Sequence, residues 1–543
     1  MANNDEERPK EILPPDCLYE IFKKLEDDKQ TLFRCMLGNR EWCCQIVPIL
    51  WSYPFRSLSS ESQILIVPSF INCLNEQEKI SLVNLGIPLK ASKRSRPVFE
   101  YSTFIKEIDV EKLENSVEKW LKLSFTREPE AGLWNKVISV SKKFFQLIFR
   151  TSTAFENLHI EKTKVISYIP DFTMFPNAPK ALAHLKKFKY CGWQGNYLHK
   201  DLSNVTELLT AMKLMTRDLE SIEVDFQNIN NINAQKLTDL VSLQNSLQYF
   251  KFINLLDQYG EILMPGLREK QGKNIKTLFF DSLHFYVEES TYLEHLEYFN
   301  VLETLIFEDC QADVESDIES YEWWMSLARG PMSLKRLYFN VKHLNGQVLI
   351  PIISHTKGNL QELIIRQECS ASLFNSINET SRNIVSLSVV IDGSAVNSLL
   401  NALVGLRQLE QLIIRQSLDG GTPISLEIWP KLARILPKSL NYFLVDFNEF
   451  SADSLAIFLQ TRETPIRQIG FGNADVFGSG HLVVIIYYAR EKSIVRKVGF
   501  STRSHRFQYS HFNREILSKA KEYIEFVDII EFDRDPNSLG MRF

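Results

Sequence analysis

Two stretches, Glu362-Leu-Ile-Ile-Arg-Gln367 and Gln411-Leu-Ile-Ile-Arg-Gln416, differ only in their first residue and begin 49 residues apart. Each has a leucine two residues upstream, Leu360 or Leu409, which completes the pattern apolar-x-x-apolar-x-apolar. A nearly identical segment at such a separation indicates internal repetition, which has to be tested before any other fold is considered.

The same pattern recurs along most of the chain after residue 150. From residue 219 onward its first positions advance by 24 to 32 residues, an interval that random apolar content would not keep. Patterns typical of helices lie between them, as at 205–215, 293–301, 396–406 and 455–459. The first positions are Phe155, Leu185, Leu219, Leu247, Ile275, Leu302, Leu334, Leu360, Ile384, Leu409, Leu440, Ile466, Val495 and, more loosely, Ile524.

One short strand and one helix every 24 to 34 residues resembles the leucine-rich repeat, in its longer helix-containing subtypes. The resemblance implies an α/β solenoid over residues 151–543, with parallel strands on the concave face and helices on the other side. The asparagine or cysteine that the family places after the last apolar position is met only by Cys310 and Asn448, so the repeats are degenerate. A doubly wound α/β enzyme, the competing fold, needs an early glycine-rich phosphate turn that this sequence lacks.

Residues 11–53 form a separate pattern of short helices, after a polar stretch at 1–10 that we expect to be a disordered tail. Asp16 occupies the position of an N-cap for the first helix. The second helix is expected to start after Asp28 and to stop at Gly38 in a left-handed cap, and Pro48 interrupts the third.

Several positions in this segment resemble the F-box, in the form seen in long fungal F-box proteins. They are Leu13-Pro14, Leu18, Ile21-Phe22, Leu25, Leu32, Cys35, Asn39-Arg40-x-Trp42-Cys43 and Leu50-Trp51. The sequence departs from the family at Gly38, where an apolar residue is usual. The alternative is a generic three-helix cap on the repeats. The resemblance implies that a Skp-family adaptor, and through it a cullin, is bound by Leu13, Pro14, Leu18, Ile21, Phe22, Leu25, Leu32 and Trp42.

Residues 54–150 are expected to be a mostly helical linker or cap, with the clearest helices at 111–123 and 133–149. The basic stretch 90–97 predicts an exposed loop, and a weak nuclear-import patch is the alternative.

Composition and cysteine spacing narrow the class of protein. Lysine and arginine number 62 against 67 aspartates and glutamates, so no overall field attracts nucleic acid or an anionic membrane. No secretory signal begins the chain, and no apolar run approaches the ~20 residues of a membrane span. The eight cysteines lack metal-site spacing, so we expect neither zinc nor disulfides. These features predict a soluble cytoplasmic or nuclear protein without nucleic acid or membrane as a partner.

No catalytic or cofactor motif is complete. The glycine-rich stretch 470–480 lacks the lysine of a phosphate-binding loop, and no Pro-Cys-x-x-Cys follows His159-Ile-Glu161 as a deaminase requires. Cys310 occupies a repeat position, where a buried core residue is expected rather than a nucleophile. We therefore expect a non-catalytic protein with no cofactor and no metal.

Residues that alternate with the buried strand positions should lie on the concave face. An apolar strip is expected there in adjacent strands, made of Phe279, Ile306, Tyr338, Ile364 and Ile413. Arg366 and Arg415, with one strand between them, are expected to orient an acidic or phosphorylated target segment. The acidic segment 308–322 is either a partner-facing loop or solvated surface. The alternatives for the strip are a different register or a face covered by its own loops.

Taken together, the resemblance implies the substrate-recognition subunit of a Skp/cullin/F-box E3 ubiquitin ligase. The F-box would bind the adaptor, and the repeats would bind a protein target whose identity the sequence does not give. One alternative is a non-catalytic scaffold or regulator that binds the adaptor without ubiquitin transfer. Another is an unrelated repeat recognition protein.

Overall fold

The computed structural model describes residues 13–56, 59–87, 89, 97–124, 130–152, 155–161, 171–191, 203–285, 290–312, 329–330, 333–344, 346–417, 422–425, 427–447, 450–462, 464, 466–472, 477–492, 495–500 and 513–528. The chain divides into two compact units, Met1–Gln248 and Tyr249–Phe543. Each unit is described by itself.

The first unit begins with three short helices, α1 (Pro15–Lys23), α2 (Lys29–Met36) and α3 (Arg40–Ser52). Asp28 caps α2 by accepting from the Thr31 amide, and Asn39 caps α3 by accepting from the Trp42 amide.

Three local expectations for these helices are wrong. The N-cap of α1 is Pro14, so Asp16 lies inside the first turn, and α2 ends before Gly38, which does not adopt a left-handed conformation. A Cβ at Gly38 would lie 3.3 Å from the Trp42 ring, so close packing is the feature that favours glycine there. Helix α3 runs through Pro48, and the Ser52 hydroxyl donates to the Pro48 carbonyl at 2.8 Å.

The region expected to be a helical linker is helical, and it also contributes the first strand. Helices α7 (Val110–Ser124) and α8 (Glu130–Thr151) match the two predicted helices. The short elements before them are α4 (Ser60–Gln63), α5 (Ile66–Cys73), α6 (Glu76–Asn84) and the 3₁₀ turn η1 (Tyr101–Phe104). Strand β1 (Glu107–Asp109) was not predicted, because a single isoleucine between two acidic residues carries no strand pattern.

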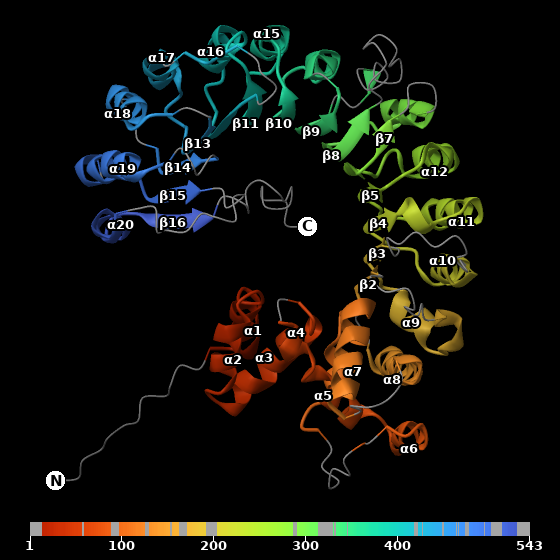
Figure 1. The fold of residues 1–543 in the computed structure, drawn as a ribbon. Helices are drawn as coiled ribbons and strands as arrows, with labels where there is room; N and C mark the ends of the chain where they lie inside the picture. Colours follow the sequence, from red (N-terminus) through yellow and green to blue (C-terminus); the bar gives the residue numbers. More distant parts are fainter. Residues whose placement is uncertain are drawn as a thin grey trace, which may run out of the picture. The chain divides into compact units, whose positions relative to one another are not determined.

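Four parallel strands pair in the first unit: β1, β2 (Asn157–Glu161), β3 (Lys187–Cys191) and β4 (Ser221–Asp225). Their connections contain η2 (Phe172–Met174), α9 (Ala178–Leu182), α10 (Ser203–Met215), η3 (Phe226–Asn228) and α11 (Asn231–Ser242). Helices α9, α10 and α11 lie along one face of this sheet (Figure 1).

The second unit repeats the strand–helix alternation with parallel pairing in sequence order. Its strands are β5 (Tyr249–Ile253), β6 (Thr277–Asp281), β7 (His284–Phe285), β8 (Thr304–Ala312), β9 (Arg336–Lys342), β10 (Glu362–Glu368), β11 (Ser386–Ile391), β12 (Gln411–Gln416), β13 (Tyr442–Asp446), β14 (Gln468–Phe471), β15 (Lys497–Phe500) and β16 (Glu525–Asp528). Strand β7 is an extra strand that pairs with β8.

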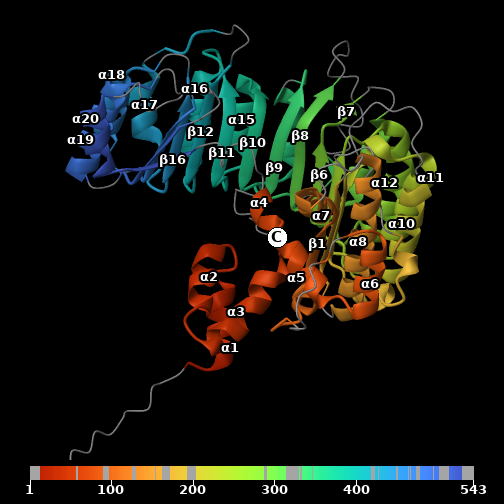
Figure 2. The same ribbon diagram turned by 60° about the horizontal axis from the view of Figure 1, so that its bottom comes forward.

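The helical elements of this unit are α12 (Asp257–Gln271), η4 (Ser290–Tyr298), η6 (Gly346–Leu349), α14 (Ile350–His355), α15 (Ala371–Thr380), α16 (Val396–Gly405), α17 (Ile428–Ile435), α18 (Ala452–Thr461), α19 (Ser479–Lys492) and α20 (Arg514–Lys521). Within the unit, α15 to α19 lie outside a curve whose inner side is formed by the strands (Figures 1 and 2). The α/β class and the parallel repeated sheet are confirmed. The helix expected at 293–301 is instead the 3₁₀ element η4.

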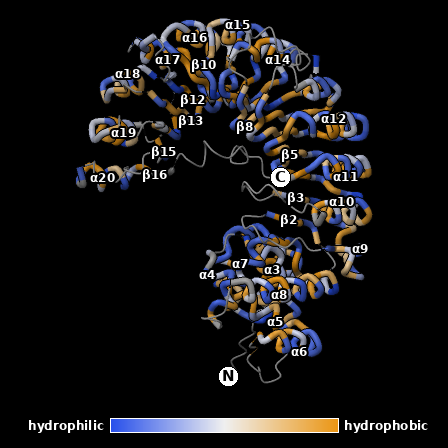
Figure 3. Tube along the Cα trace, turned by 45° about the vertical axis from the view of Figure 1, so that its right-hand side comes forward, coloured by the Kyte–Doolittle hydropathy of each residue, from blue (hydrophilic) through white to orange (hydrophobic). Residues whose placement is uncertain are grey.

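The buried core explains why the repeat is visible in the sequence. The third apolar position of successive motifs falls in register, so that Phe252 pairs with Phe280, and Phe280 pairs with Phe307. Their rings stack with centroids 4.9 and 5.2 Å apart, close to the ~4.8 Å spacing of strands. Hydrophobic and hydrophilic residues alternate along the covering helices, as Figure 3 shows for α11 and α12. Each helix therefore buries one side against its sheet.

Candidate partner-binding surfaces

The eight residues expected to bind an adaptor include both buried and exposed side chains. Leu18, Phe22 and Leu32 are buried together with Ile46 and Ile49 in the core of the three helices. The Phe22 ring meets the Trp42 ring edge-on, with centroids 5.5 Å apart. These side chains hold α1 and α2 on α3, so they support a docking surface rather than form it.

Leu13, Pro14 and Ile21 remain exposed, and Leu25 is partly exposed. Leu13 precedes the N-cap of α1 and is 51% exposed, and Ile21 on α1 is 47% exposed. The exposed apolar side chains therefore lie just before α1 and on the part of α1 that does not bury Leu18 and Phe22.

Phe33 and Leu37 on and after α2 are also exposed, at 54% and 71%. Neither residue was predicted to bind the adaptor. The sequence could have indicated them, because apolar residues four positions apart lie on the same side of a helix, and this side of α2 differs from the one that buries Leu32. Exposed apolar side chains gathered on a small module favour binding to another protein.

The end of α3 is continuous with the rest of the first unit. Trp51 packs on Tyr101 and Phe70, with ring centroids 4.3 and 5.9 Å apart. The Arg56 guanidinium donates to the Glu107 carboxylate on β1 at 2.9 Å. The end of α3 is therefore packed on α5 and η1, and the residues that follow it are tied to β1.

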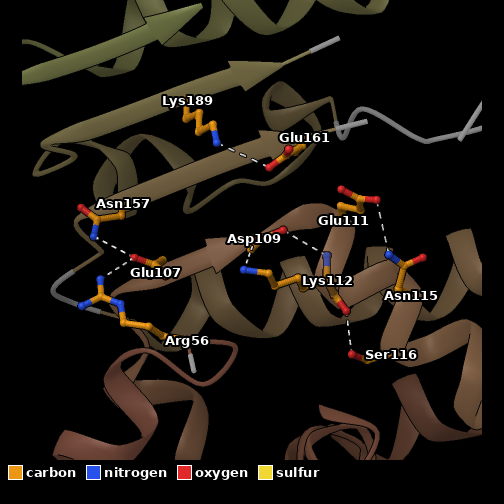
Figure 4. A network of polar contacts seen from close by, with 10 residues as sticks. All are labelled: Arg56, Glu107, Asp109, Glu111, Lys112, Asn115, Ser116, Asn157, Glu161 and Lys189. Carbon is orange, nitrogen blue, oxygen red and sulfur yellow. Dashed lines mark hydrogen bonds and ion pairs between the residues drawn. The ribbon is translucent and has the colours of Figure 1, made fainter. Parts of the chain in front are cut away.

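Figure 4 shows the polar contacts around β1 to β3 in the first unit. Glu107 accepts from Arg56 and also from Asn157 on β2, at 3.1 Å from the amide nitrogen. Lys112 at the start of α7 binds Asp109 through its ammonium group at 3.0 Å. On the next strand pair, Lys189 and Glu161 form an ion pair at 3.5 Å.

A row of titratable residues runs across this sheet, with Asp109, His159, Lys189 and Glu223 paired in sequence. Burial lowers the pKa of His159, although the neighbouring Glu107 and Asp109 carboxylates oppose this shift. Burial opposes ionisation of Glu107, yet His159 and Arg56 keep its pKa below the usual value. The bonds that Glu107 accepts from Arg56 and Asn157 offset the cost of burying its carboxylate on the sheet.

In the second unit the predicted apolar strip is aligned as expected. Phe279, Ile306, Tyr338 and Ile364 pair strand by strand, and they pack together as one cluster. Ser388 on β11 occupies the next place in this row, and Ile413 follows it on β12. Ile413 belongs to a second cluster, with Tyr442 and Leu444. Each of the five predicted side chains is at most 8% exposed, so the strip leaves little apolar surface for a target, and target binding by it stays a prediction.

Charged neighbours contribute to this burial. The Lys251 ammonium lies over the Phe279 ring at 3.9 Å and pairs with Asp281 at 2.7 Å. The Arg366 guanidinium lies 5.9 Å from the Tyr338 ring centroid, with its Nε 3.4 Å from the Tyr338 hydroxyl. Long side chains thus lie across the apolar row, as amphipathic stems commonly do.

Arg366 and Arg415 differ in a way that the sequence did not predict. They have one strand between them, as expected, but Arg415 is only 7% exposed. Its Nη1 donates to the Ser388 hydroxyl at 2.7 Å, and its Nε lies 4.0 Å from the Asp446 carboxylate. Arg415 therefore holds neighbouring strands together, and this contact competes with any role in target binding.

Cys310, which was considered as a nucleophile, lies in the hydrophobic core. Cys310 is fully buried, with its Sγ 3.5 Å from the Phe280 carbonyl, and burial raises the pKa of its thiol. This confirms its assignment to the core. All eight cysteines carry free thiols. Among the described residues, no cluster of three or more histidine, cysteine, aspartate or glutamate side chains has the arrangement of a metal site.

Several predicted segments lie outside the described residues: the tail at 1–10, the basic residues at 90–96, and most of the acidic segment and of the glycine-rich centre, at 313–322 and 473–476. Within the described part of the chain, the helices are all too short or too polar to cross a bilayer.

Comparison with known proteins gave no assignment. No protein-family model matches the sequence, and no curated protein matches it.

Proposed function

We propose that this chain is the substrate-recognition subunit of a Skp/cullin/F-box E3 ubiquitin ligase. Its first three helices bind a Skp-family adaptor, its repeats bind a protein target, and acyl transfer is left to other subunits. The observation that carries the proposal is the division of apolar residues in and just before α1: Leu18 and Phe22 build a core while Leu13 and Ile21 stay exposed.

This division supports docking because the positions that resemble the F-box include both buried core residues and exposed apolar residues. A segment that served only as a cap on the repeats would have no use for large apolar side chains on its outer side. Half-exposed leucine and isoleucine side chains retain apolar surface that a partner can bury, and central apolar anchors dominate many interfaces.

The packing of α3 supports the second half of the proposal. A substrate receptor acts by proximity, holding a target at high effective concentration near the transferring enzyme. The contacts of Trp51 with Phe70 and Tyr101, and of Arg56 with Glu107, join the end of α3 to the rest of the first unit.

Affinity purification tests the proposal directly. Deleting residues 11–53 would also remove the contacts of Trp51, so a point variant is the cleaner perturbation. We expect Leu13→Glu plus Ile21→Glu to lose the adaptor and the cullin, whereas Lys23→Glu plus Lys24→Glu, on the same exposed helix, keeps both.

Two outcomes would contradict the proposal. Undiminished adaptor recovery with the Leu13 and Ile21 variant would remove the F-box assignment. Adaptor binding without cullin, and without ubiquitin transfer to a co-purified protein in a reconstituted reaction, would favour the scaffold alternative.

A further inference from the structure

A groove of about 710 Å³ lies in the second unit, between the turns that follow α15 and α16. Its volume falls within the ~300–1,000 Å³ typical of ligand sites. The two helices pack side by side, and both lead into strands of the same sheet (Figures 1 and 2). The groove therefore belongs to two consecutive repeats.

Its polar lining combines two arginines with neutral amide side chains. The side chains are Asn378, Arg382, Asn383, Asn401, Arg407 and Gln408, of which Asn383 already donates to the Gly358 carbonyl at 2.8 Å. No carboxylate is among the lining residues. Gly405 keeps the groove open, because a Cβ at this position would lie 3.0 Å from the Asn378 side-chain oxygen.

The two arginines occupy the same position of consecutive repeats. Arg382 lies two residues before Ile384 and Arg407 two residues before Leu409, the first apolar positions of their motifs. Neighbouring strands are ~4.8 Å apart and packed helices ~8–10 Å, so the two backbones lie roughly 5 to 10 Å apart. Two guanidinium groups at that separation can reach one oxyanion.

Both arginines are available for a ligand. Each is exposed, and within the described residues neither guanidinium takes part in an ion pair or hydrogen bond. The guanidinium of Arg415, in contrast, is buried and donates to Ser388. The planar fork of arginine suits bidentate recognition of phosphate or carboxylate, and the amides of Asn401 and Gln408 supply further neutral donors.

We propose that this groove binds a phosphorylated segment of a protein, with Arg382 and Arg407 on the phosphate and the amide side chains on the adjoining peptide. In assigning the occupant to a target protein, the inference rests on the proposed function. It places target recognition at the edge of the repeats instead of on the open face of the strands.

Fluorescence anisotropy tests this with the purified full-length chain and a labelled degenerate peptide mixture that carries one central phosphoserine. Removing both guanidinium groups, Arg382→Ala plus Arg407→Ala, should weaken binding by roughly thirtyfold or more, since hydrogen bonds to charged groups are among the strong ones. The matched control is Lys431→Ala plus Arg434→Ala on α17, two exposed cations outside the groove. It changes net charge equally and should leave binding within about twofold.

Several results would overturn the proposal. They are no binding by the intact chain at millimolar peptide, equal loss in the control variant, equal binding of the unphosphorylated mixture, or displacement by inorganic phosphate at concentrations equal to the peptide. The same variants should retain the adaptor in affinity purification. Loss of peptide binding with the adaptor retained therefore separates this inference from the proposed function.

Discussion

Substitutions of the neighbouring residues Ile21 and Phe22 in α1 should have different effects, one on adaptor binding and the other on folding. Phe22 is 4% exposed and packs edge-on against Trp42, so Phe22→Ala should destabilise the three helices by about 3–5 kcal/mol. A module with so small a core should then unfold locally. Ile21→Ala removes a half-exposed side chain from a helix and substitutes the best helix former, so its stability should hardly change.

The expected loss of affinity follows from the surface still exposed. Full burial of an isoleucine or leucine side chain is worth about 1.5–3 kcal/mol, and about half of Ile21 and of Leu13 remains to be buried. Each should contribute about 1 kcal/mol, so Leu13→Ala plus Ile21→Ala should weaken adaptor binding by roughly thirtyfold.

Calorimetric titration with a purified Skp-family adaptor measures the affinity, and hydrogen exchange of α1 to α3 measures local stability. Glu20→Ala plus Lys24→Ala, two exposed positions on the same helix, serves as the control. Unchanged affinity in the Leu13 and Ile21 variant would refute the reasoning, as would strong loss of exchange protection in that variant.

Three further predictions concern other parts of the chain. His481 is buried, its Nδ1 accepting from the Gly478 amide at 3.2 Å and its Nε2 donating to the Phe450 carbonyl at 2.7 Å, and burial lowers its pKa. As the pH falls, the imidazole is therefore protonated in the unfolded chain before it is protonated in the folded one. Local stability near Gly478 should fall by up to about 1.4 kcal/mol per pH unit below pH ~6.5. Hydrogen exchange measures this stability, and a flat pH profile in that range would contradict the prediction. Arg415→Ala should lower the free energy of unfolding by about 1.5–3 kcal/mol through loss of its bond to Ser388, and a melting curve identical to the parent would show that the contact is dispensable. Elemental analysis should find no stoichiometric zinc, and titration in denaturant without reductant should find eight thiols, so bound zinc or a lower thiol count counts against the spacing argument.

The strands were predictable from the sequence because their signal is local and periodic. Each of the fourteen motifs proposed from the apolar pattern corresponds to a strand, from β2 to β16 with β7 as an addition. Strand β1 escaped because Ile108 alone carries its apolar signal. The element at 290–298 was assigned the wrong helix type, since apolar residues three and four apart fit both an α-helix and a short 3₁₀ segment.

The candidate surfaces were less predictable because exposure depends on neighbours in adjacent repeats. Alternation correctly placed Tyr338 and Ile364 in one row of the second unit's sheet. It gave no information on Arg366, whose guanidinium lies over Tyr338 from the next strand. In the same way, helical spacing placed Ile21 and Phe22 in one apolar stripe of α1 without showing that Ile21 stays exposed while Phe22 is buried.

These neighbour effects bear on where a partner can bind the second unit. On the open face of the strands, a ligand for Arg415 would have to replace its bond to Ser388, and one for Lys251 would have to replace an ion pair to Asp281. Breaking a buried, charged hydrogen bond costs about as much as the new one returns. Arg382 and Arg407 have no such bond to give up among the described residues, so binding there costs mainly the side-chain entropy of ordering, at most about 2 kcal/mol for each arginine. The charged side chains on the strands are thus already bonded within the protein, whereas Arg382 and Arg407 in the groove can bind a ligand without breaking such a bond. This difference favours the groove as the binding site.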